Sequence, residues 1–188
     1  MNMTRTSRTH PLRIDSVPYP FTDGRIGMTL CPGKHQASGR HGVRWKRDLA
    51  ADLDAIVEWK ANYLITLAEV HELQWLKVPH LGREAAARGL LWHHLPIEDG
   101  EYPSPFTLQR WQALKQELQA CLVRGGRIVF HCMGGLGRAG TMTARLLIEA
   151  GIEPEDAIAR VREARSGAIE TSIQEDWLLA AEPVSRQA

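Results

Sequence analysis

The chain has 188 residues, of which 44% are hydrophobic and 24% charged, and its formal net charge at pH 7 is +1. This is the composition of an ordinary globular protein, without the charge excess that favours nucleic acid or a membrane surface. The three cysteines lack metal-ligand spacing, and no secretory signal or ~20-residue apolar run is present, so we expect a cytoplasmic protein that binds no metal, no cofactor and no nucleic acid.

Strands and helices alternate in the first half of the chain. Residues 1–10 are polar and basic, and we expect them to form a flexible N-terminus before a single domain over residues 11–183, with 184–188 as a tail. Apolar runs bounded by Pro or Gly predict strands, and helical spacing predicts helices. In chain order these are strands at Leu12–Val17 and Ile26–Leu30, a helix after the N-cap Asp48, a strand at Tyr63–Leu67, helices at Val70–Leu76 and Arg83–Arg88, and a strand at Leu90–Leu95.

A basic segment lies between the second strand and the first helix. Residues 34–47 contain five Lys or Arg side chains and no acidic one. Two interpretations stay open, a solvated loop and a basic rim for a phosphorylated partner.

The second half continues the alternation and then becomes helical. The predicted elements are a helix at Phe106–Arg124, a strand at Arg127–His131, and helices at Thr141–Ala150, Pro154–Arg165 and Thr171–Ala180. This order predicts an α/β fold with a central, mostly parallel sheet flanked by helices. A ligand is then expected at the loops that follow the carboxyl ends of the strands.

The strand at Arg127–His131 leads into a Cys-x5-Arg loop that has the properties of a phosphate cradle. The backbone N–H groups of residues 133–137 can surround an oxyanion, and the following helix adds the positive end of its dipole. Arg138 provides a planar fork that clamps two phosphate oxygens. The proposed phosphate-binding residues are Met133, Gly134, Gly135, Leu136, Gly137 and Arg138, of which the three glycines can take positive φ and let the main chain approach a ligand closely.

The same loop is expected to activate Cys132 as a nucleophile. A helix N-terminus and nearby cations lower the pKa of a cysteine thiol from ~8.5 to roughly 3.5–7.5, so we expect a thiolate at neutral pH. Such a thiol is also prone to oxidation. His131 closes the preceding strand, and we assign it a supporting role behind the loop.

Two further segments supply candidate catalytic groups. Attack on a phosphate ester needs a general acid for the leaving oxygen, and Glu98 and Asp99 both fit in a Pro- and Gly-rich loop after the strand at Leu90–Leu95. Gln174 is a candidate for orienting the hydrolytic water. The pattern Thr171-x-x-Gln174 also predicts a capping box for the last helix, and the two roles are compatible.

Taken together, these motifs resemble the cysteine-dependent dual-specificity phosphatases, and within them the kinase-associated phosphatase group, which binds cyclin-dependent kinases. The resemblance runs from about Cys31 to Leu179. It rests on the motifs His131-Cys132-x-x-Gly135-x-x-Arg138, Ile97-Glu98-Asp99-Gly100 and Gly167-Ala168-Ile169-Glu170-Thr171.

The resemblance implies the phosphatase fold and a role for each matching residue. Cys132 is implied as nucleophile, Arg138 as phosphate clamp, Asp99 as general acid and Gln174 as the water-orienting residue, with Glu170 in a supporting position. The family usually has Ser or Thr directly after the arginine, where this chain has Ala139. We therefore expect the second chemical step to be slow.

The expected substrate is a phosphoprotein or phosphopeptide, a kinase among the candidates, and the expected state is a monomer. Two alternatives stay open. One is a phosphatase of a non-protein ester such as a phosphoinositide or nucleotide. The basic segment favours this alternative, although the loop itself carries no lysine. The other is a phosphate-binding pseudophosphatase, which is disfavoured by the presence of Cys132, Arg138 and Asp99 together.

Overall fold

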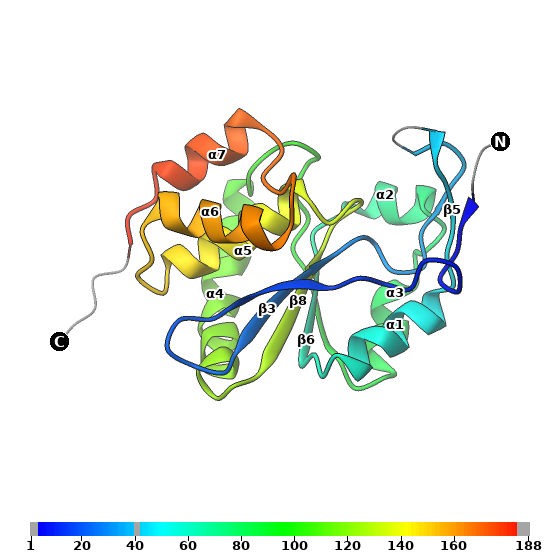
Figure 1. Cartoon of the computed structure of the whole chain (residues 1–188), viewed down its shortest axis with the longest axis horizontal. Coiled ribbons are helices and arrows are strands. Elements are labelled where there is room, and N and C mark those ends of the chain that lie inside the picture. Colours follow the sequence, from blue (N-terminus) through cyan, green and yellow to red (C-terminus); the bar gives the residue numbers. More distant parts are fainter. Residues whose placement is uncertain (1–3, 40–41, 184–188) are drawn as a thin grey trace.

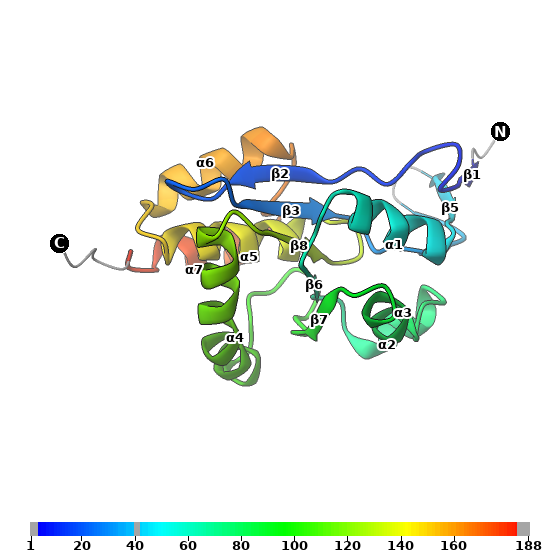
Figure 2. The same cartoon turned by 90° about the horizontal axis from the view of Figure 1, so that it is seen from below.

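A five-stranded sheet forms the centre of the molecule (Figures 1 and 2). The computed structural model describes residues 4–39 and 42–183. In spatial order the strands are β2 (Asp15–Pro18), β3 (Arg25–Thr29), β8 (Arg127–His131), β6 (Tyr63–Thr66) and β7 (Leu91–His94). Only β2 is antiparallel to its neighbour. The predicted α/β fold with a mostly parallel sheet flanked by helices is therefore confirmed.

Helices cover both faces of this sheet. One face carries α4 (Pro105–Val123), α5 (Gly137–Ile148), α6 (Pro154–Ala164) and α7 (Ser172–Leu179), and the other carries α1 (Leu49–Glu58), α2 (Val70–Trp75) and α3 (Leu81–Ala86). Because side chains alternate along a strand, Ile128 and Phe130 of β8 pack into the first core and Val129 into the second. Within the described residues, no helix has both the length and the apolarity to cross a bilayer.

The predicted element boundaries hold to within two residues except at β2 and α5. Helix α5 begins at Gly137 instead of Thr141, because the loop turns directly into the helix. Asp48 caps α1 as expected, and its carboxylate accepts the N–H of Ala51 at 2.9 Å.

The N-terminal segment is more structured than expected. A second, small sheet consists of β1 (Thr4–Arg5), β5 (Arg44–Lys46) and β4 (His35–Gln36). Thr4–Arg5 pairs with β5, and the Arg5 guanidinium lies 5.4 Å from the centre of the Trp45 ring. The structure thus places residues 4 and 5 in a sheet, within the segment that the sequence predicts to be flexible, while residues 1–3 and the predicted tail at 184–188 lie outside the described residues.

Candidate active site

The Cys-x5-Arg loop joins β8 to α5 at the carboxyl end of the sheet, at the top centre of Figure 1. Cys132 follows the last residue of β8, and its side chain is buried. The backbone N–H of Gly135 donates to Cys132 Sγ at 3.2 Å. The loop therefore folds back over the sulfur and directs main-chain donors toward it.

The carbonyl groups of the loop point outward and are held there by surrounding residues. Because each peptide unit is planar, a carbonyl fixed on the outside leaves the next N–H facing the interior of the loop. The acceptors and their donors are Met133 O with Cys31 N (3.2 Å) and Lys34 Nζ (3.2 Å), and Gly134 O with Arg165 Nη2 (3.1 Å).

Of the three loop glycines, only Gly135 has a positive φ, at 72°. A Cβ on Gly135 would lie 2.2 Å from the carbonyl oxygen of Thr29. Gly137 is the first residue of α5, where a Cβ would lie 2.8 Å from Glu170 Oε2. Gly134 and Gly137 do not use the positive φ that is open to a glycine. Gly137 is confined by a neighbouring side chain and not by its backbone conformation.

Arg138 lies in the first turn of α5 with 1% of its surface exposed. Both terminal nitrogens donate to the carboxylate of Glu72, at 2.8 Å for Nη2 to Oε1, and Nη1 also donates to the carbonyl of Ile97 at 3.0 Å. Arg138 Nε is buried and makes no hydrogen bond within the described residues. The guanidinium is thus fixed from one side and keeps one N–H donor for a further acceptor.

Glu72 was not predicted as part of the site, although it fixes Arg138. Its α2 helix starts with a capping box in which Glu69 N donates to Glu72 Oε2 at 2.7 Å. Burial acts to raise the pKa of Glu72, but the hydrogen bonds from Arg138 and Glu69 and the charge of Arg138 outweigh it and lower this pKa. The Glu-x-x-Glu spacing predicts the capping box. It does not predict the ion pair with Arg138, which lies 66 residues away along the chain.

His131 lies behind the loop and is neutral. Burial lowers its pKa to about 4. Thr66 Oγ1 accepts the indole N–H of Trp92 at 2.8 Å, which leaves the Thr66 hydroxyl proton for His131 Nε2 at 2.7 Å. The imidazole proton then resides on Nδ1, 3.3 Å from the carbonyl oxygen of Cys132. His131 therefore orients the first peptide unit of the loop.

Asp99 reaches the same guanidinium from the loop after β7. Its Oδ1 lies 3.0 Å from Arg138 Nη2, and 69% of its side chain remains exposed. Glu98 lines the same groove as Asp99, but its side chain forms no hydrogen bond or ion pair within the described residues. Of the two carboxylates left open by the residues alone, Asp99 is the one next to Arg138.

The Asp99 loop is attached to the C-terminal helices. Thr171 Oγ1 donates to the carbonyl of Gly100 at 2.7 Å, and Gln174 Nε2 donates to the carbonyl of Glu101 at 3.2 Å. Tyr102 stacks on Trp177 with ring centres 5.8 Å apart. In this structure the Pro- and Gly-rich loop that carries Asp99 is therefore held at three consecutive residues.

Glu170 and Gln174 both contact the loop region. The N–H of Gly137 donates to Glu170 Oε2 at 2.9 Å, so Glu170 touches the phosphate-binding loop directly. Gln174 is fully buried, and its Oε1 accepts the N–H groups of Glu170 and Thr171 at 3.0 and 3.4 Å. The predicted Thr171–Gln174 capping box is confirmed.

An open groove borders the Cys-x5-Arg loop at Met133 and the carboxylates around Arg138. It is lined by Glu69, His71, Glu72, Trp75, Glu98, Asp99 and Met133.

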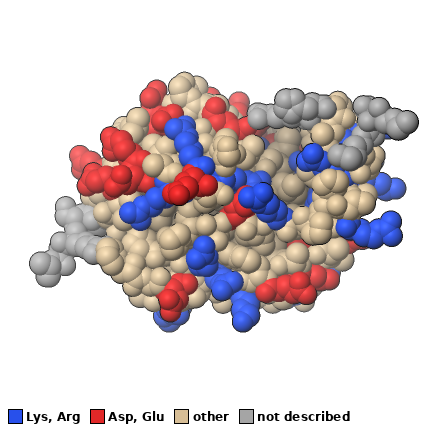
Figure 3. All heavy atoms as spheres, viewed as in Figure 1, with Lys and Arg blue, Asp and Glu red and all other residues tan. Residues whose placement is uncertain are grey.

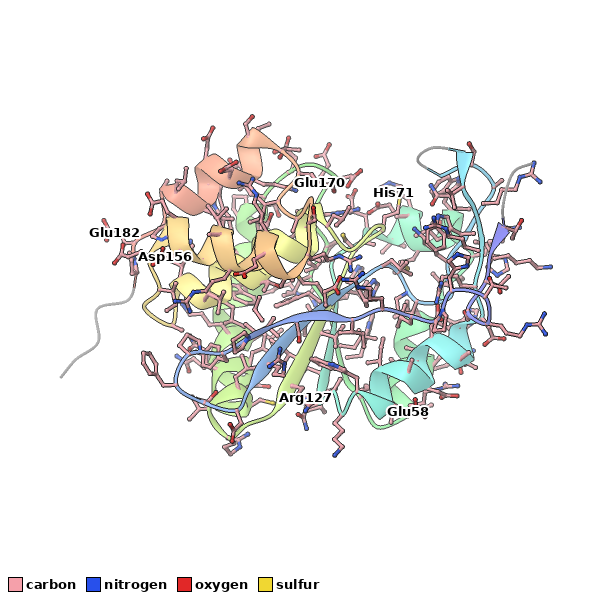
Figure 4. The ribbon with its side chains drawn as sticks, viewed as in Figure 1. Glu58, His71, Arg127, Asp156, Glu170 and Glu182 are labelled. Carbon is pink, nitrogen blue, oxygen red and sulfur yellow. The ribbon has the colours of Figure 1, made fainter. Side chains whose placement is uncertain are left out.

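Figure 4 shows His71 and Glu170 at the same edge of the molecule, on α2 and on the segment before α7. In Figure 3 the Asp and Glu side chains gather mainly over α6 and α7, while Lys and Arg extend across the middle and the right. Within the described residues, no group of three or more His, Cys, Asp or Glu could hold a metal ion.

Known protein families and curated proteins match this chain. A family described as "Polymorphic toxin system, DSP-PTPase phosphatase" matches residues 41–152. Cyclin-dependent kinase inhibitor 3 of Rattus norvegicus is 37% identical over 136 residues, which are 71% of this chain and 63% of the relative. Protein tyrosine phosphatase type IVA 3 of Homo sapiens is 38% identical over 120 residues, 63% of this chain and 66% of the relative. The chain thus spans less than two thirds of the length of these relatives.

Solved structures agree with the sequence matches. Kinase-associated phosphatase with its catalytic-site cysteine replaced by serine superposes with a TM-score of 0.76 at 27% identity, over 92% of this chain and 98% of that one. Tk-PTP in its active form gives a TM-score of 0.62 at 28% identity, over 87% and 93%. The family match covers more than half of the chain and includes the whole Cys-x5-Arg loop. The chain therefore belongs to the dual-specificity and tyrosine phosphatase (DSP-PTPase) family.

Proposed function

We propose that this protein is a phosphoprotein phosphatase that hydrolyses phosphate monoesters through a phosphocysteine at Cys132. The observation that carries this proposal is the arrangement around Arg138. Its buried guanidinium is fixed by Glu72 on one side, and it retains an unpartnered N–H in the turn that follows Cys132. A phosphate oxygen would accept that N–H in a charge-assisted hydrogen bond.

In the first step the Cys132 thiolate attacks phosphorus, so that an S–P bond forms and the ester O–P bond breaks. The inward N–H groups of Gly134 and Gly135 and the guanidinium of Arg138 stabilise the phosphoryl oxygens. Asp99, which lies 3.0 Å from Arg138 and is exposed to the groove, donates a proton to the leaving oxygen.

In the second step water attacks phosphorus and the S–P bond breaks, which regenerates the thiolate and releases inorganic phosphate. Asp99, now a carboxylate, takes the proton from this water. Gln174, whose side chain lies next to Gly137 of the loop, orients the water. Its hydrogen bonds to the backbone of Glu101, Glu170 and Thr171 hold the amide in one orientation.

The groove favours a protein substrate over a multiply phosphorylated small molecule. Four carboxylates line it together with Trp75 and Met133, namely those of Glu69, Glu72, Glu98 and Asp99. Carboxylates repel additional phosphates, whereas apolar surface accommodates a peptide. The names of the relatives make a kinase the first phosphoprotein to test.

Turnover of a phenyl phosphate ester tests the mechanism. We expect Cys132→Ser to abolish turnover and Asp99→Asn to lower kcat by roughly 10²–10⁴-fold with a flattened alkaline limb of the pH–rate profile. Glu98→Gln is the matched control, and it should keep the alkaline limb. Full activity in both the Cys132 and the Asp99 variant would refute the proposal. A Cys132→Ser trapping screen against a phosphopeptide panel then identifies the substrate.

A further inference from the structure

Lys34 is a buried cation without a carboxylate partner. Its side chain is 4% exposed, Nζ donates to the carbonyl of Met133 at 3.2 Å, and Nζ lies 4.4 Å from the centre of the Trp45 ring. Two other buried cations have bidentate carboxylate partners, Arg47 with Asp52 and Arg138 with Glu72, whereas the described residues offer Lys34 none. A buried charge without a counter-charge is costly.

Among the charged and titratable groups around Lys34, one can serve as the anion that balances its charge. Lys34 interacts electrostatically with Cys31, Cys132, Arg47 and Arg165, and the two arginines repel it. Burial raises the pKa of the Cys31 thiol far above its ordinary value, so Cys31 stays neutral. Cys132 is the remaining group that can carry a negative charge.

We propose that Lys34 is the counter-ion of the Cys132 thiolate and a positioning residue of the phosphate-binding loop. This inference rests on the proposed function. By binding the carbonyl of Met133, the ammonium turns the N–H of Gly134 toward the interior of the loop. Its charge favours the ionised form of the nucleophile. Burial lowers the pKa of Lys34 to about 8, so the ammonium is present at neutral pH and is lost as the pH rises above that value.

The pH dependence of Cys132 alkylation by iodoacetamide tests this role, with Cys132 followed by peptide mass spectrometry. In Lys34→Met we expect the midpoint to rise by at least ~1 pH unit. At a pH below both midpoints, the alkylation rate then falls about tenfold for each pH unit by which the midpoint rises. Lys34→Arg should retain the wild-type midpoint. Lys46→Met is the matched control, because Lys46 is exposed in the same basic segment, and it should leave the profile unchanged.

A folded Lys34→Met variant with the wild-type midpoint would overturn the proposal. If that variant does not fold, the reciprocal measurement decides: the titration of Lys34, followed by ¹³C NMR of its ε-carbon in wild type and in Cys132→Ser. Since coupling between two sites is reciprocal, removing the thiolate must lower the pKa of Lys34 below its wild-type value. An unchanged Lys34 titration would refute the counter-ion role while leaving the phosphatase mechanism intact, because wild-type turnover tests that separately.

Discussion

Ala139 stands directly after the phosphate-binding arginine, at a position where the resemblance led us to expect a hydroxyl. It is fully buried. Thr141, the nearest alternative along the chain, donates its hydroxyl proton to the carbonyl of Gly137 at 2.8 Å. That proton is therefore already used within α5, and the Cys132 sulfur has no hydroxyl donor from either residue.

We expect phosphocysteine breakdown to limit turnover in this protein. In Ala139→Ser the added hydroxyl should stabilise the departing thiolate and accelerate that step roughly tenfold or more, the effect of one hydrogen bond to a charged group. Pre-steady-state kinetics would show a burst of leaving group in the wild type and a smaller one in the variant. Thr141→Val is the control and should leave the rate of breakdown unchanged. Absence of any burst in the wild type would contradict this expectation.

At the scale of single elements, the phosphate-binding loop depends on one glycine conformation. Gly135 combines a φ of 72° with a contact against the main chain of β3, where a Cβ would lie 2.2 Å from Thr29 O. Its neighbour Gly134 has no atom within 4 Å of an added Cβ. Of these two adjacent glycines, Gly135 is thus sterically constrained and Gly134 has room for a side chain.

This contrast predicts opposite outcomes for two alanine substitutions. Gly135→Ala should lower the free energy of unfolding by at least ~2 kcal/mol, because the left-handed conformation alone costs an alanine about 1–2 kcal/mol and the contact with β3 adds to it. Gly134→Ala should leave stability within about 1 kcal/mol of wild type. Urea denaturation measures both. Equal effects of the two substitutions would mean that the loop does not have the conformation described.

Elements defined by local pattern were predictable, and those defined by distant partners were not. The strand before Cys132 and the capping box at Thr171–Gln174 follow from neighbouring residues. The hairpin of β4 and β5 has too few apolar residues to signal strands. Nothing local to Glu72 or Lys34 indicates burial, because their side-chain hydrogen-bond partners Arg138 and Met133 lie 66 and 99 positions away.

For the whole molecule, the buried groups behind the loop link its stability to pH. His131 has a pKa of about 4 in the folded chain against 6.5 as its ordinary value, because burial disfavours the imidazolium. Between these values the unfolded chain binds a proton that the folded chain does not, so stability falls as the pH decreases. The lowered pKa of Glu72 adds a loss below pH 4.5, where the unfolded carboxylate is protonated first.

The free energy of unfolding should therefore decrease by roughly 3 kcal/mol through His131 alone as the pH falls from above 6.5 to 4. Urea denaturation at a series of pH values gives the slope. In His131→Asn, which does not titrate, the slope between pH 6.5 and 4.5 should flatten, whatever the absolute stability of the variant. A slope equal to that of the wild type would show that His131 is not the group responsible.

The attachment of the Asp99 loop to α7 has a consequence for the timing of the reaction. Gly100, Glu101 and Tyr102 are all bonded to or stacked against the C-terminal segment, so Asp99, the proposed proton donor, lies next to Arg138 before any ester arrives. The entropy of ordering that loop is lost during folding and not in each catalytic cycle. Encounter with substrate can then lead directly to bond cleavage. A substitution that weakens the packing of α7 would therefore first slow proton transfer to the leaving group.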